Sequence, residues 1–255
     1  MKIYEYPDKG DSLTCLFISN ESNEKYWADS ENNILNMMIQ HIRELDNNPQ
    51  FLDLGCGLGR LFSVFYPYVK SITGLEPDAE RFSQAKKEAT RIDTDKITVI
   101  NADISCINNE KFDAVLVSHI FQHIPFETTK SIFKKLSNII PSGGLLFITT
   151  TFTNTNKDVF TLEYLKNNKH FSEVVSEKDF IKRFYTKGVL PVREFSTSTM
   201  QKLFDTNFFE IEKTFCYHFD VSKMANLPSI TYDEEMNFSG DLKNAKDILY
   251  ILRRK

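Results

Sequence analysis

A glycine-rich segment follows an early apolar run of the sequence. It reads FLDLGCGLGR over residues 51–60, and three of the chain's nine glycines stand at positions 55, 57 and 59. Glycine tolerates positive φ angles and lets a ligand approach the backbone closely. A helix that begins after such a turn also presents free N–H groups. The segment therefore predicts a nucleotide site between a strand and a helix, and the alternative is a tight turn without a ligand.

The spacing of these glycines narrows the choice of nucleotide. Dinucleotide-binding loops read G-x-G-x-x-G, whereas this loop reads G-x-G-x-G and lacks the Gly-Lys-Ser/Thr ending of a phosphate loop. Asp53 stands at the end of the predicted strand, just before the loop. A carboxylate at this place suits a ligand with a cationic amino group better than it suits a pyrophosphate.

Acidic residues also follow the next two predicted strands. Glu76, in GLEPD, lies 23 residues beyond Asp53, where an acid can accept hydrogen bonds from both hydroxyls of a ribose. Asp103, in NADI, can accept a hydrogen bond from an adenine amino group, and Ile104 offers its N–H group and apolar surface. The alternatives are a solvated acid at the first position and an aspartate that caps a turn at the second.

Two histidines follow the fourth predicted strand, in VLVSHIFQHIP at residues 115–125. Ser118 and His119 would face the same crevice as the glycine loop. His123 lies four residues after His119 and shares a face with it if this segment is helical. Because histidine titrates near neutral pH, His123 is our candidate for a general base. The alternative is a histidine that only packs and hydrogen-bonds.

Apolar runs alternate with helical patterns through the middle of the chain. Such alternation with short links predicts an α/β fold, in which a parallel sheet carries helices on both faces. The expected strands are 51–54, 69–75, 97–100, 112–117 and 145–151, and the helices between them are 58–66, 78–91 and 127–140. Outside this region we expect a helix that Ser30 caps and that ends before a turn at 46–49, a helix at 196–205, and strands at 208–217 and 248–252.

The pattern loosens between residues 152 and 195. Aromatic residues stand among many charged ones in this segment, and we interpret it as an inserted helical cap over an acceptor site. Its rings either line a pocket for a cationic or apolar acceptor, or pack within the cap itself.

The composition is that of a single globular domain over residues 1–255. The chain has 31 Lys and Arg against 35 Asp and Glu, a net charge of −4, and 41% hydrophobic residues. This acidic balance argues against a wide basic face for nucleic acid. The four cysteines stand far apart and no residues show zinc-site spacing, so we expect no metal. Without a long apolar run or a signal-peptide core, we expect a cytoplasmic protein with no membrane span.

Taken together, the motifs FLDLGCGLGR, GLEPD, NAD, VSHIFQHIP and PSGGLLFIT resemble those of the class I S-adenosylmethionine-dependent methyltransferases. The chain is similar in particular to the small-molecule branch that includes the ubiquinone and menaquinone biosynthesis methyltransferases. The resemblance covers residues 26–151 well and 196–252 loosely. It implies a Rossmann-like, mostly parallel sheet of seven strands whose last strand, at 248–252, is antiparallel.

The resemblance also implies the cofactor S-adenosyl-L-methionine, with S-adenosyl-L-homocysteine as its product. The loop 53–59 would wrap the methionine part, the acid after the second strand would hold the ribose, and the NADI segment would hold adenine. An N-terminal helical lid is expected within residues 1–48, and Tyr26 and Trp27 are lid candidates or, alternatively, core residues. The full set of expected cofactor-binding residues is Asp53, Gly55, Cys56, Gly57, Glu76, Pro77, Asp103, Ile104, Ser118 and His119.

The expected function is in-line methyl transfer to a small-molecule acceptor by a monomer or homodimer. The sequence lacks the Asn/Asp-Pro-Pro-aromatic motif of amino-methylating DNA enzymes, the Pro-Cys pair of cytosine-C5 enzymes and the paired-glutamate loop of arginine methyltransferases. We therefore expect no DNA partner. An RNA or protein methyltransferase and a protein that binds the cofactor without catalysis stay open. A nicotinamide-dependent oxidoreductase is disfavoured by the glycine spacing.

Overall fold

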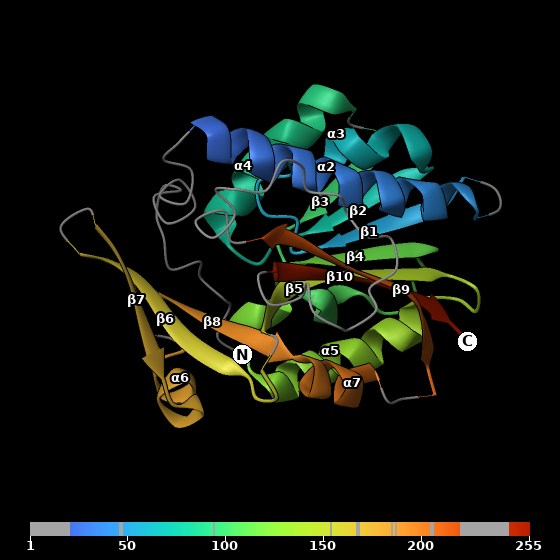
Figure 1. The fold of residues 1–255 in the computed structure, drawn as a ribbon. Coiled ribbons are helices and arrows are strands. Elements are labelled where there is room, and N and C mark those ends of the chain that lie inside the picture. The colour runs from blue at the N-terminus through green and yellow to red at the C-terminus, as the bar shows by residue number, and fades with distance from the viewer. Residues whose placement is uncertain are drawn as a thin grey trace.

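The computed structural model describes residues 21–255 apart from 46–47, 94, 154, 167–168, 185, 187, 205–206 and 220–244. A β-sheet with helices on both faces forms its centre (Figure 1). Seven strands lie in the order β3-β2-β1-β4-β5-β10-β9, and every neighbouring pair is parallel except the two that β10 makes. Their bounds are β1 Gln50–Leu54, β2 Ser71–Leu75, β3 Ile97–Ile100, β4 Ala114–Ser118, β5 Leu145–Thr153, β9 Phe209–Phe219 and β10 Ala245–Arg254. The predicted Rossmann-like sheet, with its antiparallel last strand, is confirmed.

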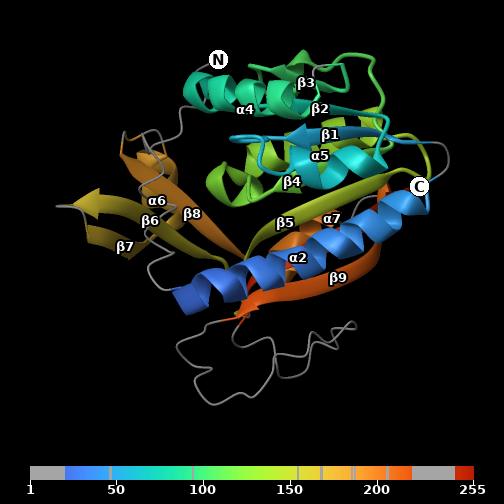
Figure 2. The same ribbon diagram turned by 90° about the horizontal axis from the view of Figure 1, so that it is seen from above.

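Each face of this sheet carries its own hydrophobic core. In β4, Val115 and Val117 enter one core while Ala114 and Leu116 enter the other, as the alternation of side chains along a strand requires. Both sets are fully buried, which explains why this strand is an unbroken apolar run in the sequence. One core lies under α2 Glu21–Arg43, α3 Phe62–Phe65 and α4 Ala79–Ile92, and the other under α5 Phe126–Ile139 and α7 Thr197–Phe204 (Figures 1 and 2).

Two helix predictions were wrong at their starts. Ser30 does not cap the first helix, because α2 already begins at Glu21 and Ser30 lies inside it. The helix expected at 58–66 begins only at Phe62 and continues as a short 3-10 turn, η1 Tyr66–Tyr68. It cannot start earlier because Gly59 has a φ angle of +80°, which a right-handed helix excludes.

The N-terminal segment packs on the sheet in its described part. Ile34, Met38 and Ile42 of α2 recur at helical spacing and are at most 4% exposed. They join the core shared with α3 and α4. The side chains of Tyr26 and Trp27, like residues 1–20, lie outside the described part of the chain, so the role of 1–48 as a lid stays a prediction.

The insertion after β5 is not the helical cap that we expected. It forms three antiparallel strands in the order β8-β6-β7 and one short helix. Phe160, Leu162 and Tyr164 alternate along β6 with a period of two and contact one small core, so the aromatic pattern was that of a strand. The bounds are β6 Val159–Lys166, β7 Lys169–Val175, α6 Glu177–Arg183 and β8 Val189–Ser196.

This three-stranded unit continues the main sheet at the carboxyl end of β5. Phe152 and Thr153 of β5 pair in parallel with Phe195 and Ser196 of β8. The unit therefore lies beside the edge at which the parallel strands end (Figure 1). No helix within the described residues is long and apolar enough to cross a membrane.

A buried ion pair lies within the insertion, and its arginine packs against Phe126 of α5. Arg193 of β8 binds the carboxylate of Asp158, and both side chains are at most 7% exposed. The guanidinium also lies 4.6–5.2 Å from the ring centres of Phe126, Phe160 and Phe195. Burial alone would raise the pKa of Asp158, but hydrogen bonds from Ser196 and the charge of Arg193 hold it below its ordinary value.

We predict that Asp158→Ala destabilises the protein by about 3–5 kcal/mol, because it leaves the Arg193 guanidinium buried without its counter-charge. Denaturant-induced unfolding measures this loss. Asp95→Ala is the matched control, since Asp95 is exposed, and it should change stability by less than about 0.5 kcal/mol. Equal effects of the two substitutions would show that the buried pair does not stabilise the fold.

Candidate cofactor and acceptor site

The glycine turn after β1 is bound to the end of β2. The backbone N–H groups of Gly55 and Cys56 both donate to the Leu75 carbonyl, at 2.8 and 2.9 Å. Gly55 has a φ angle of +73°, and a Cβ atom there would lie 2.4 Å from Cδ1 of Ile120. Only glycine fits this position, both for its backbone conformation and for the space around it.

Glu76 lies directly beside this turn. Its Oε2 atom accepts a hydrogen bond from the Gly57 N–H group and its Oε1 atom accepts one from the Asp78 N–H group, both at 2.9 Å. The side chain of Asn101 donates to the Glu76 carbonyl, which fixes the backbone at the end of β2. The residue is 5% exposed, and this burial raises the pKa of its carboxyl. The structure thus brings the predicted acid and the predicted glycine loop together.

Asp53 is a second buried acid at this edge of the sheet. It is 2% exposed, and burial raises the pKa of its carboxyl to about 7, with Glu76 adding to the rise and Arg60 opposing it. A cationic group bound next to Asp53 would stabilise the charged form and lower this pKa. The site therefore suits a ligand that carries an ammonium group.

The segment after β3 begins with a capped turn. Asp103 accepts a hydrogen bond from the Ser105 N–H group at 2.8 Å and caps the 3-10 turn η2 Ile104–Cys106. The alternative that we gave for Asp103, a turn cap, is therefore present, and its contact with adenine stays a prediction. Ile104 is 7% exposed, and Pro77 is held by its carbonyl to Asn101 at 3.1 Å.

Burial decides the chemistry of the cysteine in the glycine turn. Cys56 is 8% exposed, and burial raises the pKa of its thiol. The thiolate is the reactive form of cysteine, and a raised pKa keeps the thiol protonated near neutral pH. The Cys56 side chain is therefore a neutral group that packs in the core. Its contribution to the site is the backbone N–H bond that orients the turn.

The residues after β4 adopt a special backbone conformation. His119 has a φ angle of +53°, which is uncommon for a residue with a side chain. Its N–H group donates to the Thr149 carbonyl at 2.9 Å, and Ser118 accepts a hydrogen bond from the Thr149 hydroxyl at 3.1 Å. The end of β4 is thereby joined to the middle of β5, and the His119 side chain stays 31% exposed.

A hydrogen-bonded chain of side chains extends from His119 in both directions. Its Nε2 atom lies 2.9 Å from the Tyr217 hydroxyl of β9, and its Nδ1 atom lies 3.0 Å from Oε1 of Gln122. The Nε2 atom of Gln122 lies 3.3 Å from Nε2 of His123, whose Nδ1 atom lies 2.8 Å from the Pro191 carbonyl of β8. The chain thus connects β9, the 3-10 turn η3 Phe121–His123 and the insertion.

The surroundings of His123 do not favour its predicted role as a base. Loss of solvation lowers the pKa of its imidazole to about 4. A group with this pKa is a weak proton acceptor near neutral pH. The alternative, a histidine that hydrogen-bonds, describes its environment better.

Sequence reasoning missed four residues of this site. Gln122 stood unnoticed within the quoted VSHIFQHIP motif, and Arg81 stood in the helix after the GLEPD motif. Tyr217 and Asp247 come from β9 and β10, and no local pattern linked them to the site because pairing with other strands brings them there. Asp247 is 4% exposed, with Oδ1 3.9 Å from Nδ1 of His119.

Arg81 lies over the glycine turn. Its Nε atom is 3.9 Å from Oε2 of Glu76, and a Cβ atom on Gly57 would lie 2.6 Å from its Nη2 atom. On the other side of the turn, Arg60 forms a two-pronged ion pair with Glu31 of α2. The N-terminal helix is therefore connected directly to the loop that we expect to bind the cofactor.

Glu194 of β8 is a further acid whose environment changes its ionisation. Burial raises the pKa of its carboxyl, the positive charge of Lys246 opposes this rise, and the carboxylates of Glu163 and Asp247 add to it. Among the described residues, no group of three His, Cys, Asp or Glu side chains is arranged to hold a metal ion.

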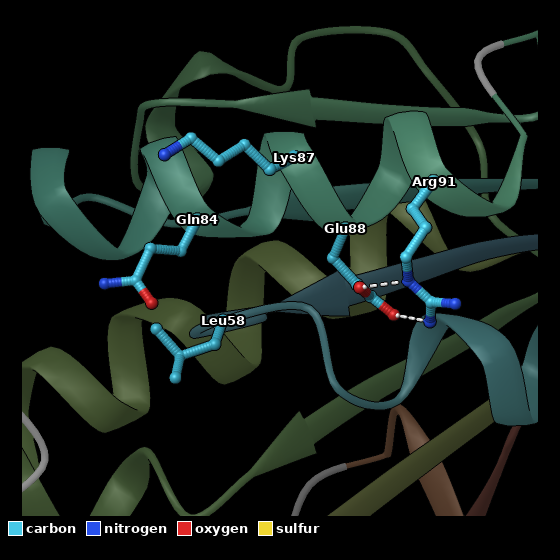
Figure 3. A pocket seen from close by; sticks show the side chains of 5 residues that line it. All are labelled: Leu58, Gln84, Lys87, Glu88 and Arg91. Carbon is cyan, nitrogen blue, oxygen red and sulfur yellow. Dashed lines mark hydrogen bonds and ion pairs between the residues drawn. The ribbon is translucent and has the colours of Figure 1, made fainter.

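A shallow depression lies elsewhere, on α4 (Figure 3). It is lined by Leu58, Gln84, Lys87, Glu88 and Arg91, and an ion pair joins the last two. Apart from Leu58, the lining residues belong to α4 and come after the first turn of that helix. Ligands of open α/β sheets bind at the carboxyl ends of the strands, so this depression is not the candidate site.

The residues at the carboxyl edge fit an adenosine ligand that carries an amino acid. Glu76 offers a carboxylate of the kind that binds a ribose diol, Asp53 offers one for an ammonium group, and Gly55 and Gly57 leave their backbone free of side chains. S-adenosylmethionine has each of the groups that this set would bind.

Comparison with known proteins supports this fit. Residues 52–148 match the family model "Methyltransferase domain". The "Probable S-adenosylmethionine-dependent methyltransferase CRG1" of Saccharomyces cerevisiae is 34% identical over 97 residues, 36% of this chain and 32% of that protein. A ubiquinone biosynthesis O-methyltransferase of Glaesserella parasuis is 24% identical over 176 residues, 66% of this chain and 68% of that protein. A crystal structure of coclaurine N-methyltransferase with S-adenosylhomocysteine has a TM-score of 0.56 at 18% identity, covering 88% of this chain and 72% of that one.

Residues 52–148 are thus similar to a methyltransferase domain, and the fold is the one seen in structures of S-adenosylmethionine-dependent methyltransferases. The matched regions span 32%, 52% and 35% of the lengths of the first three curated relatives. The cofactor of this class is S-adenosylmethionine, and the predicted resemblance is confirmed.

We predict that Glu76→Ala weakens binding of S-adenosylhomocysteine by about 5- to 150-fold, or about 1–3 kcal/mol, because the ribose loses its charged acceptor. Isothermal titration calorimetry measures the change. Glu80→Ala is the matched control, since Glu80 is exposed in the first turn of α4, and its affinity should equal that of the wild type. Unchanged affinity of a folded Glu76→Ala variant would contradict the assignment.

Asp53 makes binding depend on pH. Its pKa of about 7 in the free protein falls when an ammonium group binds beside it, so binding releases a proton near neutral pH. Affinity for S-adenosylhomocysteine should therefore be highest above about pH 7 and fall by up to about tenfold for each pH unit below that. Calorimetry in two buffers of different ionisation enthalpy detects the released proton. Asp53→Asn should bind more weakly and release none; persistent proton release in that variant would place the titrating group elsewhere.

Proposed function

We propose that this protein is an S-adenosylmethionine-dependent methyltransferase that acts on a small-molecule acceptor. The observation that carries the proposal is the Glu76 carboxylate, which is tied to Gly57 of the glycine turn at the carboxyl end of β2. Support for a small acceptor comes from relatives whose names state one, the ubiquinone biosynthesis O-methyltransferases and coclaurine N-methyltransferase.

The residues of this chain would act mainly by binding and orientation. When bound, S-adenosylmethionine supplies a methyl group on a sulfonium, whose S–C bond electrons stay on sulfur as the acceptor's lone pair forms the new bond. Asp53, the glycine turn and Glu76 would hold the donor side, and Ser118 and His119 would border the reacting end. Alignment of this kind supplies about 7–11 kcal/mol in favourable cases.

The acceptor would enter from the side of the insertion. β8 lies next to the carboxyl end of β5, and its Pro191 carbonyl is bound to His123. The named relatives include both O-methyltransferases and an N-methyltransferase. Amines and phenols are therefore the two acceptor classes to test first.

The test is formation of S-adenosylhomocysteine by the purified full-length chain. Methyl-labelled S-adenosylmethionine is incubated with pools of small amines and phenols, with total RNA and with unfolded protein, and the label is traced into each. We expect labelled small molecules and no labelled macromolecule, and Glu76→Ala should abolish the signal at limiting cofactor while Glu80→Ala should retain it. Label in RNA or protein would contradict a small-molecule acceptor and would point to a macromolecular one. Binding of the cofactor without methyl transfer to any pool would favour a protein that binds the cofactor without catalysis.

A further inference from the structure

The amide group of Gln122 has a single possible orientation. Its Oε1 atom lies 2.9 Å from the Thr151 N–H group, which can only donate, so this atom is the carbonyl oxygen. The Thr150 hydroxyl contacts the same oxygen at 3.4 Å. Gln122 is 6% exposed, so solvent does not compete for these bonds. The remaining atom, Nε2, must therefore be the donor.

This orientation decides where His119 carries its proton. Its Nδ1 atom faces the Gln122 carbonyl oxygen at 3.0 Å, and the Asp247 carboxylate lies on the same side at 3.9 Å. Both are acceptors, so Nδ1 keeps a hydrogen in the neutral and in the charged ring. The lone pair of the neutral ring is then on Nε2, opposite the Tyr217 hydroxyl, which can either donate to it or accept from it.

The same amide has the opposite effect on His123. The Pro191 carbonyl accepts from Nδ1 of this ring, so the lone pair of the neutral form is on Nε2, where the Gln122 amide N–H donates. A second proton on that nitrogen would face an N–H group. Burial lowers the pKa of His123, and the positive charges of His119 and Arg81 lower it further.

We propose that Gln122 is a positioning residue that makes His119 the proton-accepting histidine of this site and holds His123 as a neutral hydrogen-bond acceptor. This inference rests on the proposed function, to which it adds the residue that would accept the acceptor's proton. A hydroxyl or ammonium acceptor gives up one proton during methylation, and that proton would bind Nε2 of His119. The resulting imidazolium keeps its Nδ1–H bond to Gln122 and is attracted by the Asp247 carboxylate, and the Tyr217 hydroxyl changes from donor to acceptor by turning its O–H bond.

Other groups around the two rings agree with this assignment. The Tyr217 hydroxyl keeps its proton, because burial raises its pKa well above the ordinary value. Among the described residues, those beside His119 include Tyr217 from β9, Asp247 from β10 and Gln122 from η3, and the Asp247 carboxylate lies 3.9 Å from Nδ1. The positively charged or ionisable groups that act on His123 include His119 and Arg81.

The test is long-range ¹H–¹⁵N NMR of the imidazole rings in the free full-length protein, which reports tautomer and charge for each ring. The chain has five histidines, and spectra of His119→Asn and His123→Asn assign the two signals. In the wild type we expect His123 to be neutral and Nδ1-protonated from about pH 5.5 to 8.5. His119 should carry its hydrogen on Nδ1 whenever its ring is neutral.

Gln122→Glu provides the sharpest comparison. Its carboxylate accepts from both rings, so the titration midpoint of His123 should move up by about 1–3 pH units into the observed range. Gln84→Glu adds the same charge on the exposed surface of α4 and should leave both titrations unchanged. Gln122→Met keeps the volume but removes the acceptor, so neutral His119 should populate both tautomers.

Three results would overturn the inference: titration of His123 near neutral pH in the wild type, an Nε2-protonated neutral His119, or no change of His123 in Gln122→Glu. The wild-type spectra decide the matter even if the variants fail to fold. No cofactor or acceptor is present in these experiments. An absence of methyl transfer would therefore count against the proposed function alone. Any of the three contrary NMR results would count against this inference alone.

Discussion

The site is organised by the hydrogen bond between the Glu76 carboxylate and the Gly57 N–H group. It joins the ends of two neighbouring parallel strands, and it requires a turn that approaches β2 without side chains. The same carboxylate accepts from Asp78, whose own side chain caps α4, so one buried acid aligns the turn, the strand end and the start of a helix. A buried charge needs such partners, because its desolvation would otherwise destabilise the fold.

The other half of the site is held together by hydrogen bonds between side chains rather than by a buried acid. Here uncharged hydrogen-bond donors and acceptors connect elements that are distant in sequence, from Tyr217 on β9 through Gln122 to Pro191 on β8. Antiparallel β10 contributes to this arrangement, because its insertion between β5 and β9 places Asp247 beside His119. Acids and backbone groups thus form the side expected to bind the methyl donor. The side expected to face the methyl acceptor is formed by a hydrogen-bond network whose proton positions depend on the Gln122 amide.

Much of the fold and the donor side could be predicted from the sequence because their signals are local. The strands of the central sheet are buried on both faces and so stand out as apolar runs, and the glycines and acids follow them directly. The strands of the insertion were missed because β6 and β7 carry charged residues between their aromatic ones, which hides the apolar pattern of a buried strand. Gln122, Tyr217 and Asp247 escaped because only tertiary pairing brings them together.

A crystal structure of the protein with S-adenosylhomocysteine tests the central claim most directly. The account predicts that both ribose hydroxyls lie within hydrogen-bond distance of the Glu76 carboxylate and that the ligand's ammonium group lies beside Asp53. Ligand bound on α4 or elsewhere, with these two carboxylates facing no part of it, would contradict the account.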